Sequence, residues 1–375
     1  MNPQPDVPFF SASGAAFGVD LGACLQSAVA QGRYVLGPRV RAFEAAFARY
    51  LGVAHAVGVG NGTDALTLAL RALGVGPGQR VLTAANAGCY ASTAIAQVGA
   101  QALYADVAPQ DLNLAPRAVE QVLQEGQVAA VILTHLYGRM GDVERIAAAC
   151  HAAGVPLIED CAQAHGAARG GRKAGAWGAL ACFSFYPTKN LGALGDGGLV
   201  ATPDAALAER VRALRQYGWA GKYEVTLPGG INSRLDELQA AVLLAKLPHL
   251  DAANAERRAI AERYRAAFAD LPLRLPSPAG EDDVAHLYVV RTPRRDALRA
   301  HLAAHAIACD VHYPLPDHRQ PVRAHETGAA VSLPVTEAAC AQVLSLPCCP
   351  GLAPAQIGRV IEAVRAFFHD GAATC

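Results

Sequence analysis

The sequence predicts an α/β protein whose central sheet is mostly parallel. Residues 55–201 alternate short apolar strands with helices, an order that is typical of a parallel sheet with helices on its faces. The clearest strand, residues 128–133, is almost continuously apolar, as expected for a strand covered on both faces. Ligands bind such sheets beyond the carboxyl ends of the strands, so polar residues at those ends are candidate site residues.

Length and composition indicate a large buried core divided between two lobes. The chain has 375 residues, of which 52% are hydrophobic and 17% are charged, a balance typical of a globular protein. A chain of this length commonly forms more than one domain. We expect a large α/β domain with an N-terminal arm over residues 1–250, and a small C-terminal α+β domain over residues 251–375.

Charge and cysteine usage argue against several classes of function. The 32 basic and 32 acidic residues give a formal net charge of +0, which argues against binding to nucleic acid or an anionic membrane. We see no apolar run long enough to span a membrane and no secretory signal in residues 1–10. The ten cysteines include no Cys-x-x-Cys pair, which predicts reduced core cysteines and no metal site. We therefore expect a cytoplasmic protein.

The expected elements follow in order along the chain. Two helical patterns flank a Gly-Pro turn at residues 32–38, and the second is amphipathic because Val40, Phe43 and Phe47 recur at helical spacing. In the large domain we expect strands at 55–59, 80–84, 101–106, 128–133, 155–158 and 199–201, and helices at 65–73, 116–124, 143–153, 205–216 and from 235. In the smaller domain we expect strands at 285–290 and 307–311, and helices at 297–304 and 354–368.

One strand-to-helix junction has the chemistry of an anion site. The strand at 55–59 runs into Gly60-Asn61-Gly62-Thr63-Asp64, where a helix begins. Exposed N–H groups and the helix dipole favour a phosphate at such a junction. The stretch is neither a dinucleotide fingerprint, whose third glycine would fall on Thr63, nor a P-loop, which requires Gly-Lys-Ser/Thr. Taken alone, the segment is explained equally well as a helix cap by Asn61 or Thr63.

Two later strand ends carry groups that can react. The strand at 155–158 is followed by Glu159-Asp160-Cys161-Ala162-Gln163, and an aromatic run delivers Ser184 and then Lys189 into a glycine-rich turn. A lysine in a low-dielectric site has a lowered pKa, which frees its amine for covalent carbonyl chemistry. Each residue also has an ordinary interpretation, with Lys189 on the surface, Asp160 as a helix cap and Ser184 as a strand residue.

A lysine amine, a strand-end carboxylate and a phosphate cradle together form the set that pyridoxal phosphate (PLP) requires. Lys189 would form the Schiff base, and Asp160 would keep the pyridine nitrogen protonated so that the ring accepts electrons from the substrate. Gln163 could donate to the phenolic oxygen of the ring, and Ser184 could join Thr63 at the phosphate. The ordinary interpretations do not explain why these residues occur together in this order.

Four motifs resemble, in order, those of the DegT/StrS-type sugar aminotransferases. They are Gly62-Thr63-Asp64-Ala65-Leu66, Glu159-Asp160-Cys161-Ala162-Gln163-Ala164-His165-Gly166, Phe183-Ser184-Phe185-Tyr186-Pro187-Thr188-Lys189-Asn190 and Asn232-Ser233-Arg234-Leu235-Asp236. The segments Gly32-Arg33-Tyr34-Val35-Leu36-Gly37-Pro38 and His312-Tyr313-Pro314 also match, so the resemblance spans nearly the whole chain. It implies PLP fold type I, which is aspartate-aminotransferase-like, and a homodimer with shared active sites.

The resemblance also implies a role for individual residues. It makes Lys189 the catalytic Schiff-base lysine and Asp160 the catalytic pyridinium partner, with Gln163 beside the phenolic oxygen. The phosphate would be held by Gly62, Thr63 and Ser184, with Asn232 reaching it from the neighbouring subunit. The candidate residues on the substrate side are Tyr34, Tyr186, His312 and Tyr313.

The implied reaction moves an amino group from L-glutamate to a nucleotide-linked 3-keto-6-deoxyhexose, with dTDP the expected nucleotide. Its products are a 3-amino sugar and 2-oxoglutarate, and the cofactor alternates with pyridoxamine phosphate. Enzymes that aminate C4 carbonyls or cyclitols share the same core motifs and remain alternatives. A sugar 3-dehydratase of this fold would carry histidine in place of Lys189. A non-catalytic regulatory PLP-binding protein would not require the full set of residues.

One segment departs from the family pattern. Members commonly have Asn-Thr-Phe after the second strand of the large domain, with the aromatic ring against the cofactor. This chain has Asn86-Ala87-Gly88-Cys89-Tyr90 instead. Either Tyr90 supplies the ring from two residues away, or the stacking contact is lost.

Overall fold

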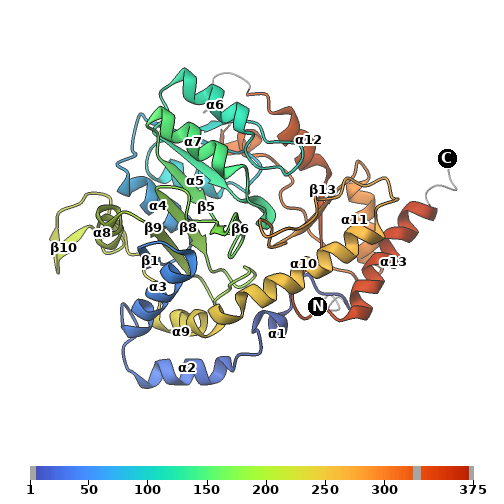
Figure 1. The fold of residues 1–375 in the computed structure, drawn as a ribbon, viewed down its shortest axis with the longest axis horizontal. Helices are drawn as coiled ribbons and strands as arrows, with labels where there is room; N and C mark the ends of the chain where they lie inside the picture. The colour runs from blue at the N-terminus through green and yellow to red at the C-terminus, as the bar shows by residue number, and fades with distance from the viewer. Residues whose placement is uncertain (1–5, 324–330, 371–375) are drawn as a thin grey trace.

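A seven-stranded sheet forms the centre of the larger lobe in the computed structural model, which describes residues 6–323 and 331–370 (Figure 1). Strand β9 runs antiparallel to both of its neighbours, β1 and β8, and the remaining neighbouring strands are parallel. The predicted α/β fold with a mostly parallel sheet is therefore confirmed. In spatial order the strands are β1 (His55–Val59), β9 (Gly198–Thr202), β8 (Leu180–Ser184), β5 (Leu157–Asp160), β4 (Ala130–Thr134), β2 (Arg80–Thr83) and β3 (Gln101–Tyr104).

Helices cover both faces of this sheet, so its central strands are apolar on both sides. In β4, Val131 and Leu133 join the core on one face, whereas Ala130 and Ile132 join the core on the other. That alternation explains why the sequence there is almost continuously apolar. The first face is covered by α3 (Pro38–Leu51), α6 (Pro116–Glu125), α7 (Val143–Ala153) and α9 (Glu237–Lys246), and the second by α4 (Gly62–Ala72), α5 (Tyr90–Gln97) and α8 (Ala205–Leu214).

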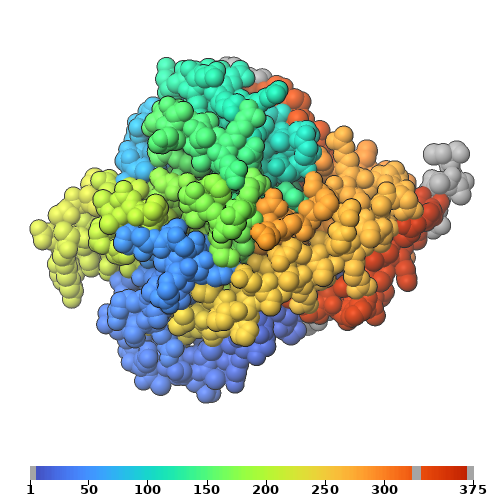
Figure 2. All heavy atoms as spheres, in the orientation of Figure 1, coloured from blue at the N-terminus to red at the C-terminus, as the bar shows by residue number. Residues whose placement is uncertain are grey.

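A separate core holds the smaller lobe together around the long helix α10 (Leu250–Ala267), which Figure 2 shows as a yellow to orange band across one face of the molecule. We propose a division between residues 250 and 251, because α10 begins there and contributes to this core. Val7 of the N-terminal segment also joins it, through a bridge to Ile307. The other elements here are α11 (Arg295–Ala304), β12 (Tyr288–Arg291), β13 (Val343–Leu346) and α13 (Pro354–Asp370). Helix α12 (Pro334–Gln342) packs instead on the core of the larger lobe, through Val335 and Ala339.

Two expectations for the smaller lobe were wrong. Residues 307–311 form no strand, and only isolated bridges occur at Ile307 and Asp310. The strand expected at 285–290 begins at Tyr288 and pairs with β13, which the sequence did not indicate. Residues 284 and 287 are instead tied to the larger lobe, where Val284 N donates to Gly138 O at 3.0 Å and Leu287 N donates to Tyr137 O at 3.1 Å.

The remaining short elements lie at the edges of the two lobes. The hairpin β10–β11 projects from the larger lobe and exposes Tyr223 (Figures 1 and 2). Within the described ranges, the structure has no helix that is both long and apolar enough to cross a membrane. The short elements are α1 (Ala12–Ala15), α2 (Leu21–Ala30), η1 (Leu136–Gly138), β6 (Ala168–Arg169), β7 (Arg172–Lys173), β10 (Trp219–Gly221), β11 (Glu224–Val225), η2 (Leu247–His249), η3 (Asp317–Arg319) and η4 (Pro321–Arg323).

Candidate active site

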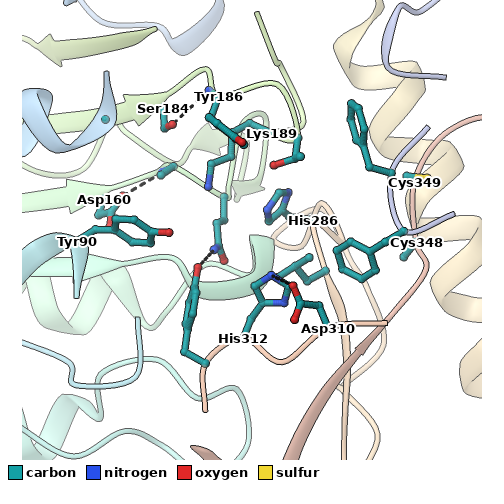
Figure 3. A pocket seen from close by; sticks show the side chains of 18 of the residues that line it. Tyr90, Asp160, Ser184, Tyr186, Lys189, His286, Asp310, His312, Cys348 and Cys349 are labelled. Carbon is teal, nitrogen blue, oxygen red and sulfur yellow. Dashed lines mark hydrogen bonds and ion pairs between the residues drawn. The ribbon is translucent and has the colours of Figure 1, made fainter. Parts of the chain in front are cut away.

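A cavity of about 650 Å³ lies at the carboxyl ends of β5 and β8, between the two lobes. Two of the predicted site residues do not line it. Tyr34 is about half exposed near α2, where its hydroxyl donates to Val29 O at 3.5 Å, and Asn232 forms an isolated bridge with Gln216. The other predicted residues all line the cavity, and Figure 3 labels several of them: Gly62, Thr63, Asp160, Gln163, Ser184, Tyr186, Lys189, His312 and Tyr313.

Lys189 occupies a tight turn that follows β8. Its N–H donates to Tyr186 O at 2.8 Å, and a Cβ on Gly192 would lie 2.3 Å from Pro187 O, so the turn closes because residue 192 has no side chain. The side chain enters the cavity from this turn (Figure 3). Desolvation lowers the pKa of Lys189, and the charge of Asp160 opposes that change. The lowered pKa favours the uncharged amine, which is the nucleophilic form.

Asp160 is the last residue of β5, whereas the sequence suggested that it lies just beyond the end of the strand. Its Oδ1 accepts from Ala162 N at 3.1 Å, and its Oδ2 accepts from Thr134 Oγ1 at 3.1 Å. Burial raises the pKa of Asp160, and the amide of Ala162, the charge of Lys189 and the hydroxyl of Thr134 oppose the rise. Each carboxylate oxygen therefore has one protein donor and retains acceptor capacity towards the cavity.

A second buried carboxylate, that of Glu159, is held behind Asp160 by hydrogen bonds from the protein. Its Oε2 accepts from Gly175 N at 2.8 Å and lies 2.9 Å from His135 Nε2, and its Oε1 accepts from Trp177 N at 2.7 Å and Gly178 N at 2.8 Å. Burial alone would raise the pKa of Glu159, but the hydrogen bonds from His135 and the backbone lower it below its ordinary value. Both oxygens of Glu159 are thus occupied by protein donors, and Asp160 is the carboxylate of this pair that lines the cavity.

The anion site suggested by the sequence lies where α4 meets β8 and β9. Asn61 caps the helix, since its Oδ1 accepts from Asp64 N at 2.8 Å, and Thr63 lines the cavity. A Cβ on Gly62 would lie 2.7 Å from Ser184 Cβ, so this close approach requires glycine. The two sequence interpretations are compatible, because Asn61 is the cap and Thr63 remains available to a ligand.

Gln163 connects the cavity wall to two tyrosines. Its Oε1 accepts from Tyr137 N at 2.6 Å, and its Nε2 donates to the hydroxyl of Tyr313 at 3.2 Å. Tyr313 packs edge to face against Tyr90, with ring centroids 6.2 Å apart, and Tyr90 lines the cavity. Gly88 has a φ of +78°, and a Cβ there would lie 2.8 Å from the Tyr313 ring. No aromatic residue fits at position 88, and Tyr90 occupies the adjacent wall.

Three residues that belong to this site were not predicted from the sequence. Thr134 holds Asp160, whereas Arg257 and His286 line the cavity from the smaller lobe. Arg257 lies in the middle of a charged helix, and His286 lies in a segment predicted to be a strand, so neither stands in a recognisable motif. Their proximity to Lys189 depends on how the two lobes pack.

Lys246, a buried lysine next to this turn, should make the free energy of unfolding depend on pH. Lys246 is 3% exposed, donates to Gly192 O and lies 5.0 Å from the centre of the Phe17 ring. Burial lowers its pKa from 10.5 to about 8. Between pH 8 and 10.5 the unfolded chain therefore binds more protons than the folded chain, and the free energy of unfolding should rise with pH. Lys246→Met should abolish this rise, which amounts to up to about 3 kcal/mol.

Urea denaturation at several pH values checks that expectation, with the solvent-exposed Lys222→Met as the matched control. The difference between wild type and Lys246→Met should change across this interval, whereas wild type and Lys222→Met should remain parallel. Parallel curves for Lys246→Met would show that the buried amine does not carry the shifted pKa.

Comparisons with known proteins agree with this geometry. The family model described as the DegT/DnrJ/EryC1/StrS aminotransferase family matches residues 20–365. The chain is 44% identical over 365 residues to the dTDP-3-amino-3,4,6-trideoxy-alpha-D-glucose transaminase of Streptomyces venezuelae, a match that covers 96% of each chain.

Solved structures show the same relationship. The X-ray structure of S. venezuelae DesV matches with a TM-score of 0.92 and 44% identity, and covers 97% of this chain and 98% of that one. The structure of NtdA from Bacillus subtilis, with bound cofactor PMP, matches with a TM-score of 0.90 and 27% identity, and covers 98% and 86% of the two chains. This chain belongs to the DegT/DnrJ/EryC1/StrS aminotransferase family.

Proposed function

We propose that the protein is a PLP-dependent aminotransferase that moves the amino group of L-glutamate to the C3 carbonyl of a dTDP-linked 3-keto-6-deoxyhexose. The observation that carries this proposal is the convergence of Lys189, Asp160 and the start of α4 on one cavity. The 44% identical relative that is named as a 3-amino-sugar transaminase supports amination at C3.

The groups that line the cavity suit PLP. The crowded junction of Gly62 with Ser184 leaves the first N–H groups of α4 and the Thr63 hydroxyl beside the cavity, which suits a phosphate. Asp160 offers an acceptor to a protonated ring nitrogen, and Lys189 offers an amine with a lowered pKa. When bound, PLP supplies an aldehyde that takes up amines and a protonated ring that withdraws electrons from the substrate's α-carbon.

We assign the chemical roles among the cavity residues as follows. Lys189 Nζ would hold the cofactor, and its free amine would accept and return the substrate proton as a general base and acid. Asp160 would keep the ring nitrogen of the cofactor protonated, and Thr134 and the amide of Ala162 hold the Asp160 carboxylate in place. Gln163 retains one N–H for the phenolic oxygen after its bond to Tyr313. Tyr90 is the cavity aromatic available to face the ring.

We further propose a homodimer with shared active sites in the cytoplasm. Tyr34 and Asn232 lie outside the cavity of their own chain, which is consistent with a contribution of both residues to the cavity of a second copy. Tyr186 and Tyr90 are about half exposed although they line this cavity, so its rim has apolar surface for a partner. Buried thiols such as those of Cys161 and Cys182 suit a reducing compartment.

A panel of amino-sugar nucleotides, run in reverse with 2-oxoglutarate, tests the substrate assignment. The panel contains dTDP-linked 3-amino-6-deoxyhexoses, the 4-amino isomers and an aminocyclitol, and glutamate formation is measured by mass spectrometry. We expect kcat/KM to favour the 3-amino sugars by at least roughly tenfold, the scale on which pocket contacts discriminate.

Each other outcome has a defined meaning. Preference for a 4-amino sugar or for a cyclitol would replace the substrate assignment and keep the aminotransferase. A bound cofactor whose absorbance does not change on addition of glutamate would identify a non-catalytic PLP-binding protein instead.

A further inference from the structure

A buried histidine from the smaller lobe faces the same cavity as Lys189. His286 is 7% exposed and lies in the loop before β12, and Figure 3 shows its ring turned towards the cavity space that Lys189 enters. Its backbone is held on both sides, because Val284 N donates to Gly138 O at 3.0 Å and Arg257 Nη1 donates to His286 O at 3.2 Å. The ring position is therefore set by contacts between the two lobes.

The neighbouring asparagines determine which nitrogen of this ring carries the proton. Asn190 Nδ2 lies 2.8 Å from Asn254 Oδ1 and 3.2 Å from Val284 O. A backbone carbonyl can only accept, so the NH₂ group of Asn190 must face Val284 O. The Oδ1 atom of Asn190 therefore faces His286 Nδ1, at 2.8 Å. Asn254 is oriented in turn because its Nδ2 donates to His165 O at 2.8 Å.

This arrangement leaves one nitrogen of His286 as an acceptor. Because Asn190 Oδ1 carries no hydrogen, Nδ1 of His286 must donate, and in the neutral ring Nε2 then carries the lone pair. No described residue forms a hydrogen bond with Nε2. Burial lowers the pKa of His286 well below its ordinary value, and the nearby charges of Lys189 and Arg257 lower it further. The ring is thus kept neutral.

Because Nε2 of His286 is a hydrogen-bond acceptor, it should interact differently with the amino donor and with the acceptor sugar. The amino donor brings carboxylates, which accept hydrogen bonds and are not attracted by a second acceptor. A sugar ring brings hydroxyl groups, which donate, and those next to its carbonyl enter the cavity with the reacting carbon. A protonated histidine here would instead attract a carboxylate, so the neutral state matters as much as the position.

We propose that His286 is a specificity-determining residue whose Nε2 accepts a hydrogen bond from a hydroxyl group of the acceptor sugar, next to the carbon that is aminated. The proposal rests on the sugar aminotransferase function above and adds the residue that identifies the sugar. Asn190 and Asn254 are positioning residues in it, because they act by fixing the tautomer of the His286 ring.

Separate measurement of the two half-reactions in the holoenzyme tests the proposal. His286→Phe should lower kcat/KM for the sugar half-reaction by about 10–100-fold, as expected for one lost hydrogen bond at a buried site. It should leave the glutamate half-reaction within about threefold of wild type. His286→Gln, whose amide oxygen can reach the position of Nε2, should recover part of the loss. The matched control is His151→Gln on the exposed end of α7, which should change neither half-reaction.

Deoxy analogues of the amino-sugar nucleotide identify the contact. An analogue that lacks the contacted hydroxyl should slow wild type to the level of His286→Phe and should have no further effect on that variant. Equal losses in both half-reactions, or undiminished sensitivity of the variant to every deoxy analogue, would overturn the proposal. If wild type prefers a 4-amino sugar, the substrate assignment fails, and deoxy analogues of that sugar test His286 in the same way.

The tautomer has an independent readout that does not depend on turnover. In protein labelled with ¹⁵N-histidine, the signals lost in His286→Gln should show a protonated Nδ1 and an unprotonated Nε2. A ring protonated at Nε2, or at both nitrogens near neutral pH, would contradict the proposal even if the kinetic effects were present.

Discussion

Lys189→Ala is expected to lower turnover by about 10⁴-fold or more, because one amine both holds the cofactor and moves the proton. Gly62, Thr63 and Ser184 remain in place in this variant, so the cofactor should still bind non-covalently. Borohydride treatment of wild type should fix the cofactor on the peptide that contains Lys189, and the variant should yield no such peptide. Steady-state kinetics and peptide mass spectrometry measure the two effects.

Lys189→Arg is the matched variant for this prediction. Arginine keeps a positive charge opposite Asp160 but does not lose its proton in proteins, so it cannot act as a nucleophile or a base. It should be as inactive as the alanine variant, whereas the exposed Lys222→Ala should behave as wild type. Full turnover by Lys189→Ala would refute the assignment, and recovery with arginine would show that only the charge is required.

Asp160→Asn is expected to lower kcat by about 10²–10³-fold, the usual scale for removal of one preorganised electrostatic group. The substitution keeps the shape of the side chain, since the amide can accept from Ala162 N and donate to a rotated Thr134 hydroxyl. Only the charge is lost. Because the Asp160 charge opposes the desolvation of Lys189, the pKa of Lys189 should fall further in the variant. In the cofactor-free protein, the pH dependence of Lys189 modification by an amine-directed reagent should therefore shift to lower pH.

Thr134→Val separates the charge of this carboxylate from its orientation. It removes the hydroxyl that donates to Asp160 Oδ2 and leaves the charge, so we expect a loss of about 1 kcal/mol, or roughly fivefold in kcat.

An Asp160→Asn variant with kcat within about twofold of wild type would show that the cofactor ring does not depend on this carboxylate.

The sequence predicted the parts of the molecule that depend on neighbouring residues. The turn at Gly62, the helix that begins there and the apolar strand β4 all follow from patterns within about ten residues. The end of β5 was predicted two residues too early, because the polar pair Glu159-Asp160 is typical of residues that follow a strand. Glu159 is nevertheless buried in β5, since His135 and three backbone amides satisfy its carboxylate.

The smaller lobe was predicted less well, because its strands depend on partners far along the chain. Strand β12 pairs with β13 more than fifty residues later, and neither sequence pattern indicates the other. Residues 285–287 were expected in a strand, yet Leu287 and the preceding Val284 bond to Tyr137 and Gly138 in the larger lobe. Those bonds keep His286 out of the sheet and place it at the cavity.

By itself, the sequence determined the fold class and an ordered set of reactive residues, because strand–turn–helix geometry and the residue types in it are local properties. Only the tertiary structure decided which of these residues share one cavity, and it left Tyr34 and Asn232 outside. It also decided the tautomer of His286, because Asn190, oriented by Asn254, determines which ring nitrogen is protonated. Such a chain of donors and acceptors joins segments about a hundred residues apart, and it exists only once both lobes are packed together.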